Sequence, residues 1–507
     1  MRTGGLQGVL QKYNDKVKAD VKTAIRRVLT KDLPAIIDEY SENPESAQDG
    51  MPMKKLVERL QRLEPLVFEK LMARVFDRVL VLLRRAKNVH ALITAVMEAT
   101  SESELTPVAG NAAHGLSRKA TRNLARDSEE VLAAVCDGAH GRCSRLLLVR
   151  GQATAKLSLT QFASFFETCA AFVTSTERLL PGLQINSLKG TVMAQAKQFV
   201  DSFHKTNMDK LNLILDNERW NQAEVPWRIQ NMVESLKGTP EAVRDVDQGD
   251  QSTLTALTID GDKQPAVGAL LILITMVVEY VAAASQLQPQ GAEIVQRLAE
   301  LLKTFNVRTC QLILKTGAIQ VAGLRTITAK HLALSAQSVS CLVKLLPYLL
   351  DSLAAKLPVR QQVLVSELEQ AGRDLEEHRA RIFDKLVAIM SERLDAHTAN
   401  LADNDWDNTE VDVSDYMKRI LKETQAMHKV LDSLLSTSEV VEIFEKIGAM
   451  FNERLPLLIK EASLPSTQAT RRRLYGDLAH CVATLRSLGP DPGNTLVDFA
   501  RSKDGFK

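Results

Sequence analysis

The stretch Phe68–Leu82, with the sequence FEKLMARVFDRVLVL, decides the fold class of this chain. Its apolar residues recur at steps of three and four, and charged residues stand between them. This is the period of an α-helix with one buried face. The same period returns in two more segments, at Val192, Ala196, Phe199 and Phe203 and at Ile382, Leu386, Ile389 and Leu394.

The composition agrees with a helical chain. Among 507 residues there are 24 glycines and 16 prolines, about two thirds of average usage. Few turn-forming residues imply long elements and few connections. The 64 Lys and Arg balance 62 Asp and Glu, so nothing indicates a nucleic-acid partner, which would require a basic excess or patch. We therefore predict an all-α fold.

Strand signals are nearly absent. Residues Thr253–Ile259 alternate between polar and apolar side chains and stop at Asp260-Gly261-Asp262. Because one strand cannot form a sheet, we interpret this stretch as a connecting segment.

Polar stretches rich in glycine and proline divide the chain, at 41–52, 101–123, 238–263 and, more weakly, 398–412. The longest, Gly238–Lys263, is the best domain boundary. We predict an N-terminal helical segment (1–123), a helical bundle (124–240), a linker (241–263), a second bundle (264–397) and a C-terminal bundle (398–507).

No catalytic motif is present. The phosphate-binding Walker A pattern, the His-Glu-x-x-His zinc motif and the Gly-x-Ser-x-Gly elbow are all missing. We therefore expect no enzyme and no cofactor. An all-helical, metal-dependent enzyme is the less favoured alternative, and it would need an acidic cluster at Asp245 or Asp403.

Two short patterns could suggest a metal. Cys136-x3-His140-x2-Cys143 supplies three soft ligands, but a tetrahedral site needs a fourth. The acids at 403, 405 and 407 resemble the start of a calcium loop, which requires Gly at its sixth position and Glu at its twelfth. Asn408 and Ser414 stand there instead. We expect neither site to bind a metal.

Further features favour a soluble protein of the reducing cytosol. The six cysteines are scattered, and the first residues lack the apolar core of a signal peptide. The longest charge-free apolar stretch, Gln264–Val278, is shorter than the roughly 20 residues that span a bilayer. Short basic runs occur at 84–87 and 471–473. They fit solvated helix faces or a contact with acidic lipid.

Two segments carry a family resemblance. The first is Leu211–Trp220, LNLILDNERW, followed by NQAEVP to Pro226. The second begins at Phe305 with the pattern FNxRxCQL and continues through GAxQVxGLxTIT to Thr328. Together they resemble the C-terminal half of the vacuolar protein sorting 54 family, which supplies a subunit of the GARP vesicle-tethering complex.

The resemblance implies helical bundles stacked into an elongated rod, as in multisubunit tethering complexes. It implies retrograde transport from endosomes to the trans-Golgi network, with this part serving endosomal membrane targeting. The implied partners are the other GARP subunits, the endosomal membrane or a protein on it, and SNAREs through an N-terminal half that has no counterpart here. The implied location is the cytosol, peripherally at both membranes. A related tether of the exocyst or Golgi-tether type is the alternative.

The same two segments supply the candidate interaction residues. Each of them could belong to a network between helices or to a partner surface, where Trp and Arg are common anchors. They are Asp216, Asn217, Glu218, Arg219, Trp220, Arg308, Gln311, Gln320, Arg325 and Lys330.

Overall fold

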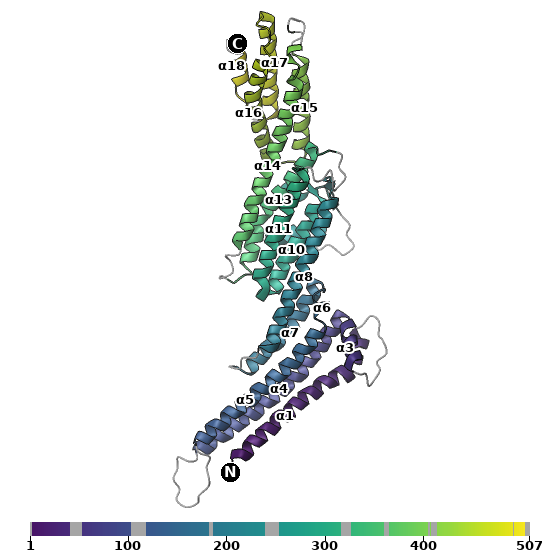
Figure 1. Cartoon of the computed structure of the whole chain (residues 1–507), viewed down its shortest axis with the longest axis vertical. Helices are drawn as coiled ribbons and strands as arrows, with labels where there is room; N and C mark the ends of the chain where they lie inside the picture. The colour runs from purple at the N-terminus through teal and green to yellow at the C-terminus, as the bar shows by residue number, and fades with distance from the viewer. Residues whose placement is uncertain are drawn as a thin grey trace, which may run out of the picture. The chain divides into compact units, whose positions relative to one another are not determined.

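A computed structural model describes residues 3–40, 53–102, 118–181, 186–238, 253–315, 326–358, 365–403, 406, 413–489 and 491–501 (Figure 1). The chain divides into two compact units. Unit 1 comprises Met1–Thr206 with Gln286–Gly291, and unit 2 comprises Asn207–Ser285 with Ala292–Lys507. The division falls inside helix α8 (Ser187–Asn217). The domain bounds expected from the sequence, with a linker at 241–263, stay a prediction.

Unit 1 is built around long amphipathic helices. In α4 the predicted stripe is buried, with Phe68, Met72, Val75 and Val79 all at most 3% exposed. Helix α4 packs against α1, α5 and α7, and Phe76 stacks on Phe172 of α7 with ring centroids 4.3 Å apart. The elements are α1 (Thr3–Arg27), the π-helix η1 (Val28–Asp32), α2 (Leu33–Tyr40), α3 (Met53–Arg62), α4 (Pro65–Glu102), α5 (Arg118–Val149), α6 (Gly151–Thr154), α7 (Leu159–Leu179) and the first part of α8.

A buried arginine fixes the turn between α3 and α4. The Arg150 guanidinium donates to the backbone carbonyls of Leu60 and Leu63 and lies 5.2 Å from the centroid of the Phe68 ring. The last carbonyls of a helix have no partner within the helix. Arg150 supplies such a partner to the carbonyls at the end of α3. Its own buried charge is hydrogen-bonded by the same contacts.

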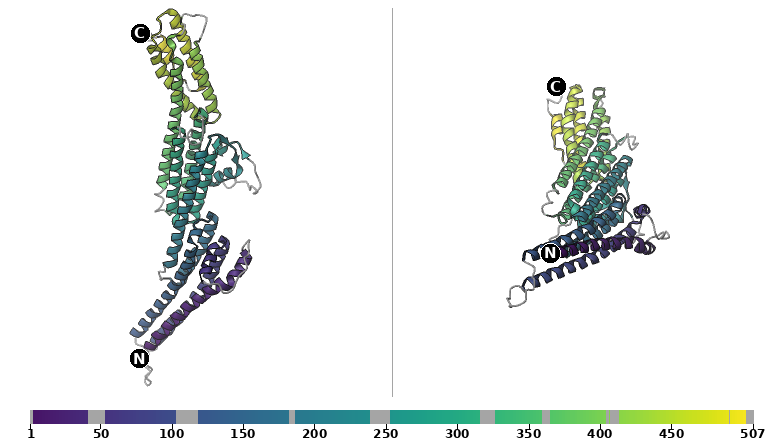
Figure 2. Two further views of the ribbon diagram at one scale, coloured as in Figure 1. Left: turned by 45° about the vertical axis from the view of Figure 1, so that its right-hand side comes forward. Right: turned by 60° about the horizontal axis from the view of Figure 1, so that its bottom comes forward.

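Unit 2 contains two stacked helical bundles that share α14. This helix packs against α13 in one bundle and against α15 and α16 in the other, as the views in Figures 1 and 2 show. The helices are α9 (Trp227–Lys237), α10 (Gly268–Gln286), α11 (Gly291–Ile313), α13 (Ala329–Ala354), α14 (Val365–Thr398), α15 (Asp415–Asp432), α16 (Thr437–Glu461), α17 (Gln468–Leu488) and α18 (Thr495–Arg501), with 3-10 turns η4 (Gln288–Gln290) and η6 (Leu401–Asp403). The predicted all-α class of helical bundles is confirmed.

Two helices, α10 and α13, are long and apolar enough to cross a membrane by length and composition alone. The prediction from Gln264–Val278 underestimated the first, because α10 continues past Glu279 to Gln286. However, 61% of the apolar window of α10 and 72% of that of α13 are buried inside the structure. We therefore interpret both as core helices of unit 2.

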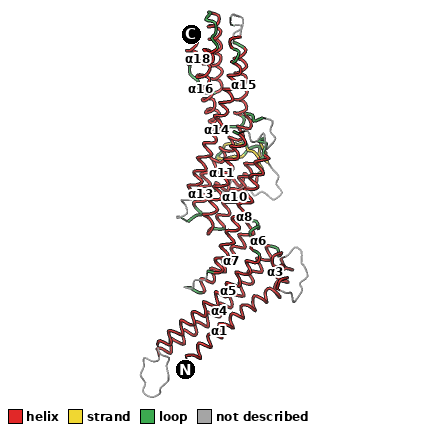
Figure 3. The backbone as a smooth tube through the Cα atoms, in the orientation of Figure 1, coloured by secondary structure: helices red, strands yellow, loops and turns green. Residues whose placement is uncertain are grey.

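The segment 253–263, expected to be a simple connection, forms strands (Figure 3). One strand from this segment and one from the residues just after it pair with the residues that follow α8. Strand β1 (Gln222–Ala223) pairs with β6 (Ala266–Val267), and β2 (Val225–Pro226) pairs with β3 (Thr253–Leu254). Strands β4 (Leu257–Ile259) and β5 (Asp262–Gln264) form a hairpin. Its two turn residues, Asp260 and Gly261, have φ of 53° and 87°, as a two-residue primed turn requires.

One buried histidine gives unit 2 a pH-dependent stability. Asn306 Nδ2 donates to the Asp374 carbonyl at 3.0 Å, so its Oδ1 accepts from His378 Nδ1 at 2.7 Å. His378 Nε2 is buried without a hydrogen-bond partner among the described residues. A proton there would be an unpaired buried charge. Burial, and to a lesser extent Arg381, lowers the pKa of His378 to about 4.

The free energy of unfolding is therefore expected to decrease as the pH is lowered, because His378 takes up a proton more readily in the unfolded chain than in the folded one. The pKa of an unfolded histidine is about 6.5, so between pH 6.5 and 4 the unfolded chain binds the extra proton. From pH 7 to pH 5 this removes about 2 kcal/mol, measurable by urea unfolding followed by circular dichroism. His378→Gln should lose this part of the pH dependence, whereas His480→Gln, at an exposed position, should retain it. Equal pH dependence in both variants would contradict the assignment.

Candidate functional site

The first candidate segment ends α8 beside α11. The Asp216 carboxylate forms an ion pair and a hydrogen bond with the Arg308 guanidinium. About a third of each side chain remains exposed, so the pair lies at the surface of unit 2. It brings together residues from both segments that carry the family resemblance. Asn217 closes the helix end, where its Nδ2 donates to the Leu213 carbonyl at 2.7 Å.

Glu218 connects the end of α8 to the start of α10. One carboxylate oxygen accepts from the Trp220 backbone N–H at 2.9 Å, and the other from the Ala269 N–H at 2.7 Å. Ala269 is the second residue of α10, whose first N–H groups have no partner within the helix. A carboxylate is also favoured there by the helix dipole. Glu218 thus has a structural role.

Trp220 is fully buried and holds the chain where it leaves α8. It has 0% exposure and a φ of 54°, which is uncommon for a residue other than glycine. Its indole N–H finds no hydrogen-bond partner among the described residues. Packing alone therefore keeps the side chain in place, and Trp220 is not available to a partner.

The remaining candidates fall into two groups, those with exposed side chains and those outside the described residues. Arg219, Gln311 and Lys330 are exposed, while Gln320 and Arg325 lie outside the described residues. Gln311 stands one helical turn after Arg308, on the same side of α11. We name the surface around the ion pair the α8–α11 patch, and it consists of Asp216, Asn217, Arg219, Arg308 and Gln311. Lys330 lies apart from this patch in the sequence, at the start of α13.

Two exposed apolar side chains adjoin the α8–α11 patch. Leu213 is 65% exposed and Val307 is 53% exposed. Leu213 precedes Asn217 by four residues and Val307 precedes Gln311 by four, so each lies on the helix face of a patch residue. Exposed apolar groups next to charged residues are common at protein interaction surfaces. Sequence reasoning missed them because helical period alone does not separate an exposed leucine from a buried one.

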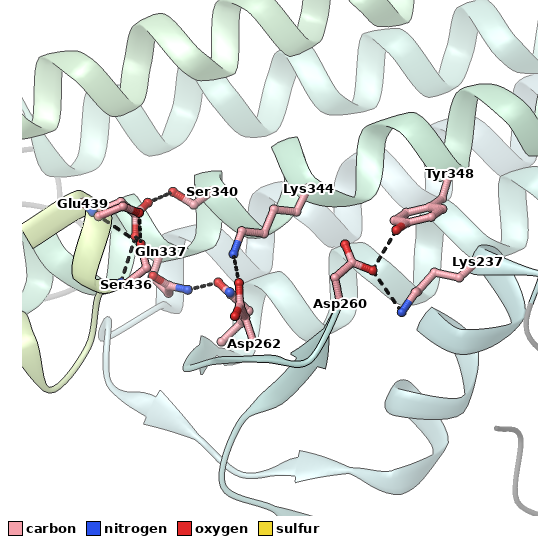
Figure 4. Close-up of polar contacts among 11 residues, drawn as sticks. Lys237, Asp260, Asp262, Gln337, Ser340, Lys344, Tyr348, Ser436 and Glu439 are labelled. Carbon is pink, nitrogen blue, oxygen red and sulfur yellow. Dashed lines mark hydrogen bonds and ion pairs between the residues drawn. The ribbon is translucent and has the colours of Figure 1, made fainter. Parts of the chain in front are cut away.

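A second polar cluster, also missed from the sequence, joins the β4–β5 hairpin to α13 (Figure 4). The Asp260 carboxylate accepts from the Tyr348 hydroxyl at 2.7 Å and pairs with Lys237 at 3.2 Å. Asp262 pairs with Lys344 at 3.0 Å. The hydrogen bond from Tyr348, and then Lys237, lowers the pKa of Asp260. The same bond with Asp260 raises the pKa of Tyr348. The cluster holds the hairpin against the helix.

The side of α13 that carries Lys344 and Tyr348 continues into the core of unit 2. Gln337 donates to the Gln264 side chain, and Ser340 donates to Glu439 at the start of α16. Positions 337, 340, 344 and 348 follow at steps of three and four on one side of α13. That polar stripe within an apolar helix was the available signal in the sequence. It indicates internal contacts rather than a catalytic group.

The described residues contain no group of three or more His, Cys, Asp or Glu placed to hold a metal. Cys136, His140 and Cys143 are all buried on α5. Burial lowers the pKa of His140 to about 4 and raises that of Cys143 to about 12, so the imidazole stays neutral and the thiol protonated at neutral pH. The acids at 405 and 407 lie outside the described residues.

Taken together, these features define a class of protein: an all-α, multi-bundle chain whose candidate sites are surfaces. Residues 262–393 match the family described as Vps54-like protein, and the resemblance to the vacuolar protein sorting 54 family is confirmed. Vacuolar protein sorting-associated protein 54 of Mus musculus is 32% identical over 72% of this chain and 37% of its own length. The chloroplastic protein of that name from Arabidopsis thaliana is 27% identical over 97% of this chain and 60% of its own.

The chain therefore spans 60% or less of the length of these relatives. Among solved structures, Exo70 of S. cerevisiae aligns over 96% of this chain and 99% of that one, with 9% identity. Its TM-score of 0.29 is too low to support an inference.

Proposed function

We propose that this chain is part of a GARP-type vesicle-tethering subunit that acts in retrograde transport from endosomes to the trans-Golgi network. In this proposal it is not an enzyme, and it works in the cytosol, peripherally associated with both membranes. It assembles with the other subunits, and it serves endosomal membrane targeting. The similarity to vacuolar protein sorting-associated protein 54 is the observation that carries the proposal.

The chemistry of the surface supports a binding role. The α8–α11 patch combines an ion pair that is about one third exposed with the exposed side chains of Leu213 and Val307. Such a surface can bury apolar groups against a partner while the charges fix its orientation. We propose this patch, together with Lys330 and the candidates Gln320 and Arg325, as a contact to another subunit. A partner could bury Leu213 and Val307 without unfolding anything in unit 2.

A tether needs reach and several contacts rather than one tight site. Helices joined through shared elements such as α14 can hold binding surfaces at fixed separations. When two weak contacts belong to one rigid body, the second forms at a high effective concentration. SNAREs would then pair while the vesicle is held nearby, and no bond chemistry by this chain is required.

The proposal predicts the behaviour of two matched variants. The patch variant, Leu213→Asp with Val307→Asp, places two charges beside the ion pair. The control, Leu148→Asp with Leu457→Asp, changes two residues of similar exposure, 61% and 54%. The tagged chain, expressed with the other GARP subunits, is isolated from cells, and the recovered subunits are quantified. We expect at least a tenfold loss for the patch variant and less than twofold for the control.

Two results would reject parts of this proposal. Equal recovery of the subunits with both variants would remove the α8–α11 patch as a contact. If the tagged chain recovered no GARP subunit and remained cytosolic, with no signal at endosomes or the trans-Golgi network, the tethering assignment would fail. Circular dichroism of both variants checks that each is folded.

A further inference from the structure

One face of α4 in unit 1 combines exposed arginines with exposed apolar residues. Arg74, Arg78 and Arg85 are exposed, and Val81, Leu92 and Val96 are 42%, 65% and 55% exposed. The six positions follow at steps of three, four or seven, so they form a single stripe. The stripe extends over about 33 Å of helix. We name it the α4 stripe.

The α4 stripe carries an excess of positive charge, and one exposed acid of α4, Asp77, lies beside it. None of its three arginines forms an ion pair among the described residues. Between 65 and 96, α4 carries six Lys and Arg against two acids, Glu69 and Asp77. Glu69 accepts hydrogen bonds from Ser164 and Thr168 of α7, at 2.9 and 3.4 Å, and so faces away from the stripe. Residues 1–206 as a whole hold 30 Lys and Arg against 22 acids.

We propose that the α4 stripe binds the surface of an anionic phospholipid bilayer. The arginines would lie against the lipid phosphates and carboxylates, and Leu92 and Val96 would enter the boundary between head groups and acyl chains. Basic and apolar residues on one side of a helix form the pattern of interfacial membrane binding. Arginine also forms two parallel hydrogen bonds with one phosphate, which adds to its charge.

The form of the stripe favours a bilayer over an acidic protein. Protein interfaces are usually anchored by tryptophan, tyrosine or phenylalanine in pockets, and the α4 stripe contains no aromatic residue. It is the outer face of a helix and therefore convex. A convex row of flexible arginines suits a broad anionic plane, where lipids can move to meet each charge. The two most exposed apolar residues lie together at one end, as a shallow insertion requires.

This inference rests on the proposed function only in assuming that the chain works at a membrane. The two can fail separately, because lipid binding is measured on the purified chain and the tethering role is measured in cells. A chain that binds vesicles but recovers no GARP subunit would reject the proposed function alone.

The test is flotation of the purified full chain with two kinds of vesicle. One contains phosphatidylcholine only, and the other replaces a third of it by phosphatidylserine. We expect binding to the anionic vesicles alone, weakening as salt is added, because salt screens exposed charges. Each basic residue near an anionic surface contributes about fivefold to the partition coefficient. Arg74→Gln with Arg78→Gln and Arg85→Gln should then lower it about a hundredfold.

The control removes the same charge elsewhere. Arg228, Arg381 and Arg419 are exposed arginines of unit 2 outside the basic run at 471–473, and their replacement by glutamine should change binding less than threefold. A second variant, Leu92→Ser with Val96→Ser, should reduce binding several-fold and leave its salt dependence unchanged. Circular dichroism confirms that the variants are folded.

Three outcomes would overturn the proposal. The first is equal binding of the wild-type chain to both kinds of vesicle, or to neither. The second is an equal loss of vesicle binding for the α4 variant and the unit 2 control. It would show that binding depends on the net charge of the chain and not on the α4 stripe. The third is binding to soluble polyglutamate as tight as to anionic vesicles, which would indicate an acidic protein partner instead.

Discussion

Replacing Trp220 by alanine is expected to lower the free energy of unfolding by about 4 kcal/mol. Trp220 is among the largest fully buried side chains of the chain. It lies between the end of α8 and the start of β1, and because the ring is fully enclosed, its removal leaves an empty space. The cost therefore includes a cavity as well as the lost burial of the ring.

The measurement is urea unfolding of the full chain, followed by circular dichroism because Trp220 is itself a fluorophore. Trp220→Phe is the matched control. It keeps an aromatic ring, and it loses no hydrogen bond since the indole N–H has no partner among the described residues. We expect a cost of about 1 kcal/mol for this variant. A cost below 1 kcal/mol for Trp220→Ala would show that the site collapses or that the ring contributes little.

The helices were predictable because their signal is local. The stripe from Phe68 to Val79 is contained in four turns of α4, and Ile382 and Leu386 are fully buried in α14 as their spacing indicates. Each stripe needs only neighbours three and four residues away to be recognised. The period does not identify the helix that covers the stripe. That α14 serves two bundles therefore could not be predicted.

The short strands were missed for the opposite reason. Val225 pairs with Leu254, and Ala223 with Ala266, across more than two dozen residues of sequence. No pattern within a two-residue strand can indicate such a partner. The β4–β5 hairpin was the exception, since Asp260-Gly261 is a strong local turn signal. Interpreting it as the end of a single strand was the avoidable error.

The candidate site was predictable in composition but not in exposure. Residues 216–220 were singled out together, yet the structure buries Trp220, uses Glu218 to cap α10 and leaves Arg219 exposed. The role of Glu218 depends on Ala269, which lies 51 residues away along the chain. Exposure is decided by the packing of remote elements, so sequence alone could nominate the segment but not its accessible side chains.

Replacing Glu439 by alanine is expected to cost about 3 kcal/mol. Its side chain, only 9% exposed, completes a capping box: one oxygen accepts from the Ser436 backbone N–H at 3.0 Å and hydroxyl at 2.8 Å. The other oxygen accepts from Ser340 of α13. Hydrogen bonds to a carboxylate are stronger than neutral ones, and alanine would take this acceptor from the buried Ser340 hydroxyl.

This one carboxylate links the two bundles of unit 2, because Ser340 lies within the Vps54-like residues 262–393 and Glu439 lies beyond them. A double-mutant cycle with Ser340→Ala should therefore give a coupling energy of about 1 to 2 kcal/mol, measured by urea unfolding. Glu445→Ala, at an exposed position of α16, should cost less than about 0.5 kcal/mol. If the Glu439 and Ser340 substitutions proved additive, Glu439 would serve only to begin α16. The Ser340 hydrogen bond would then add nothing to the joint between the bundles.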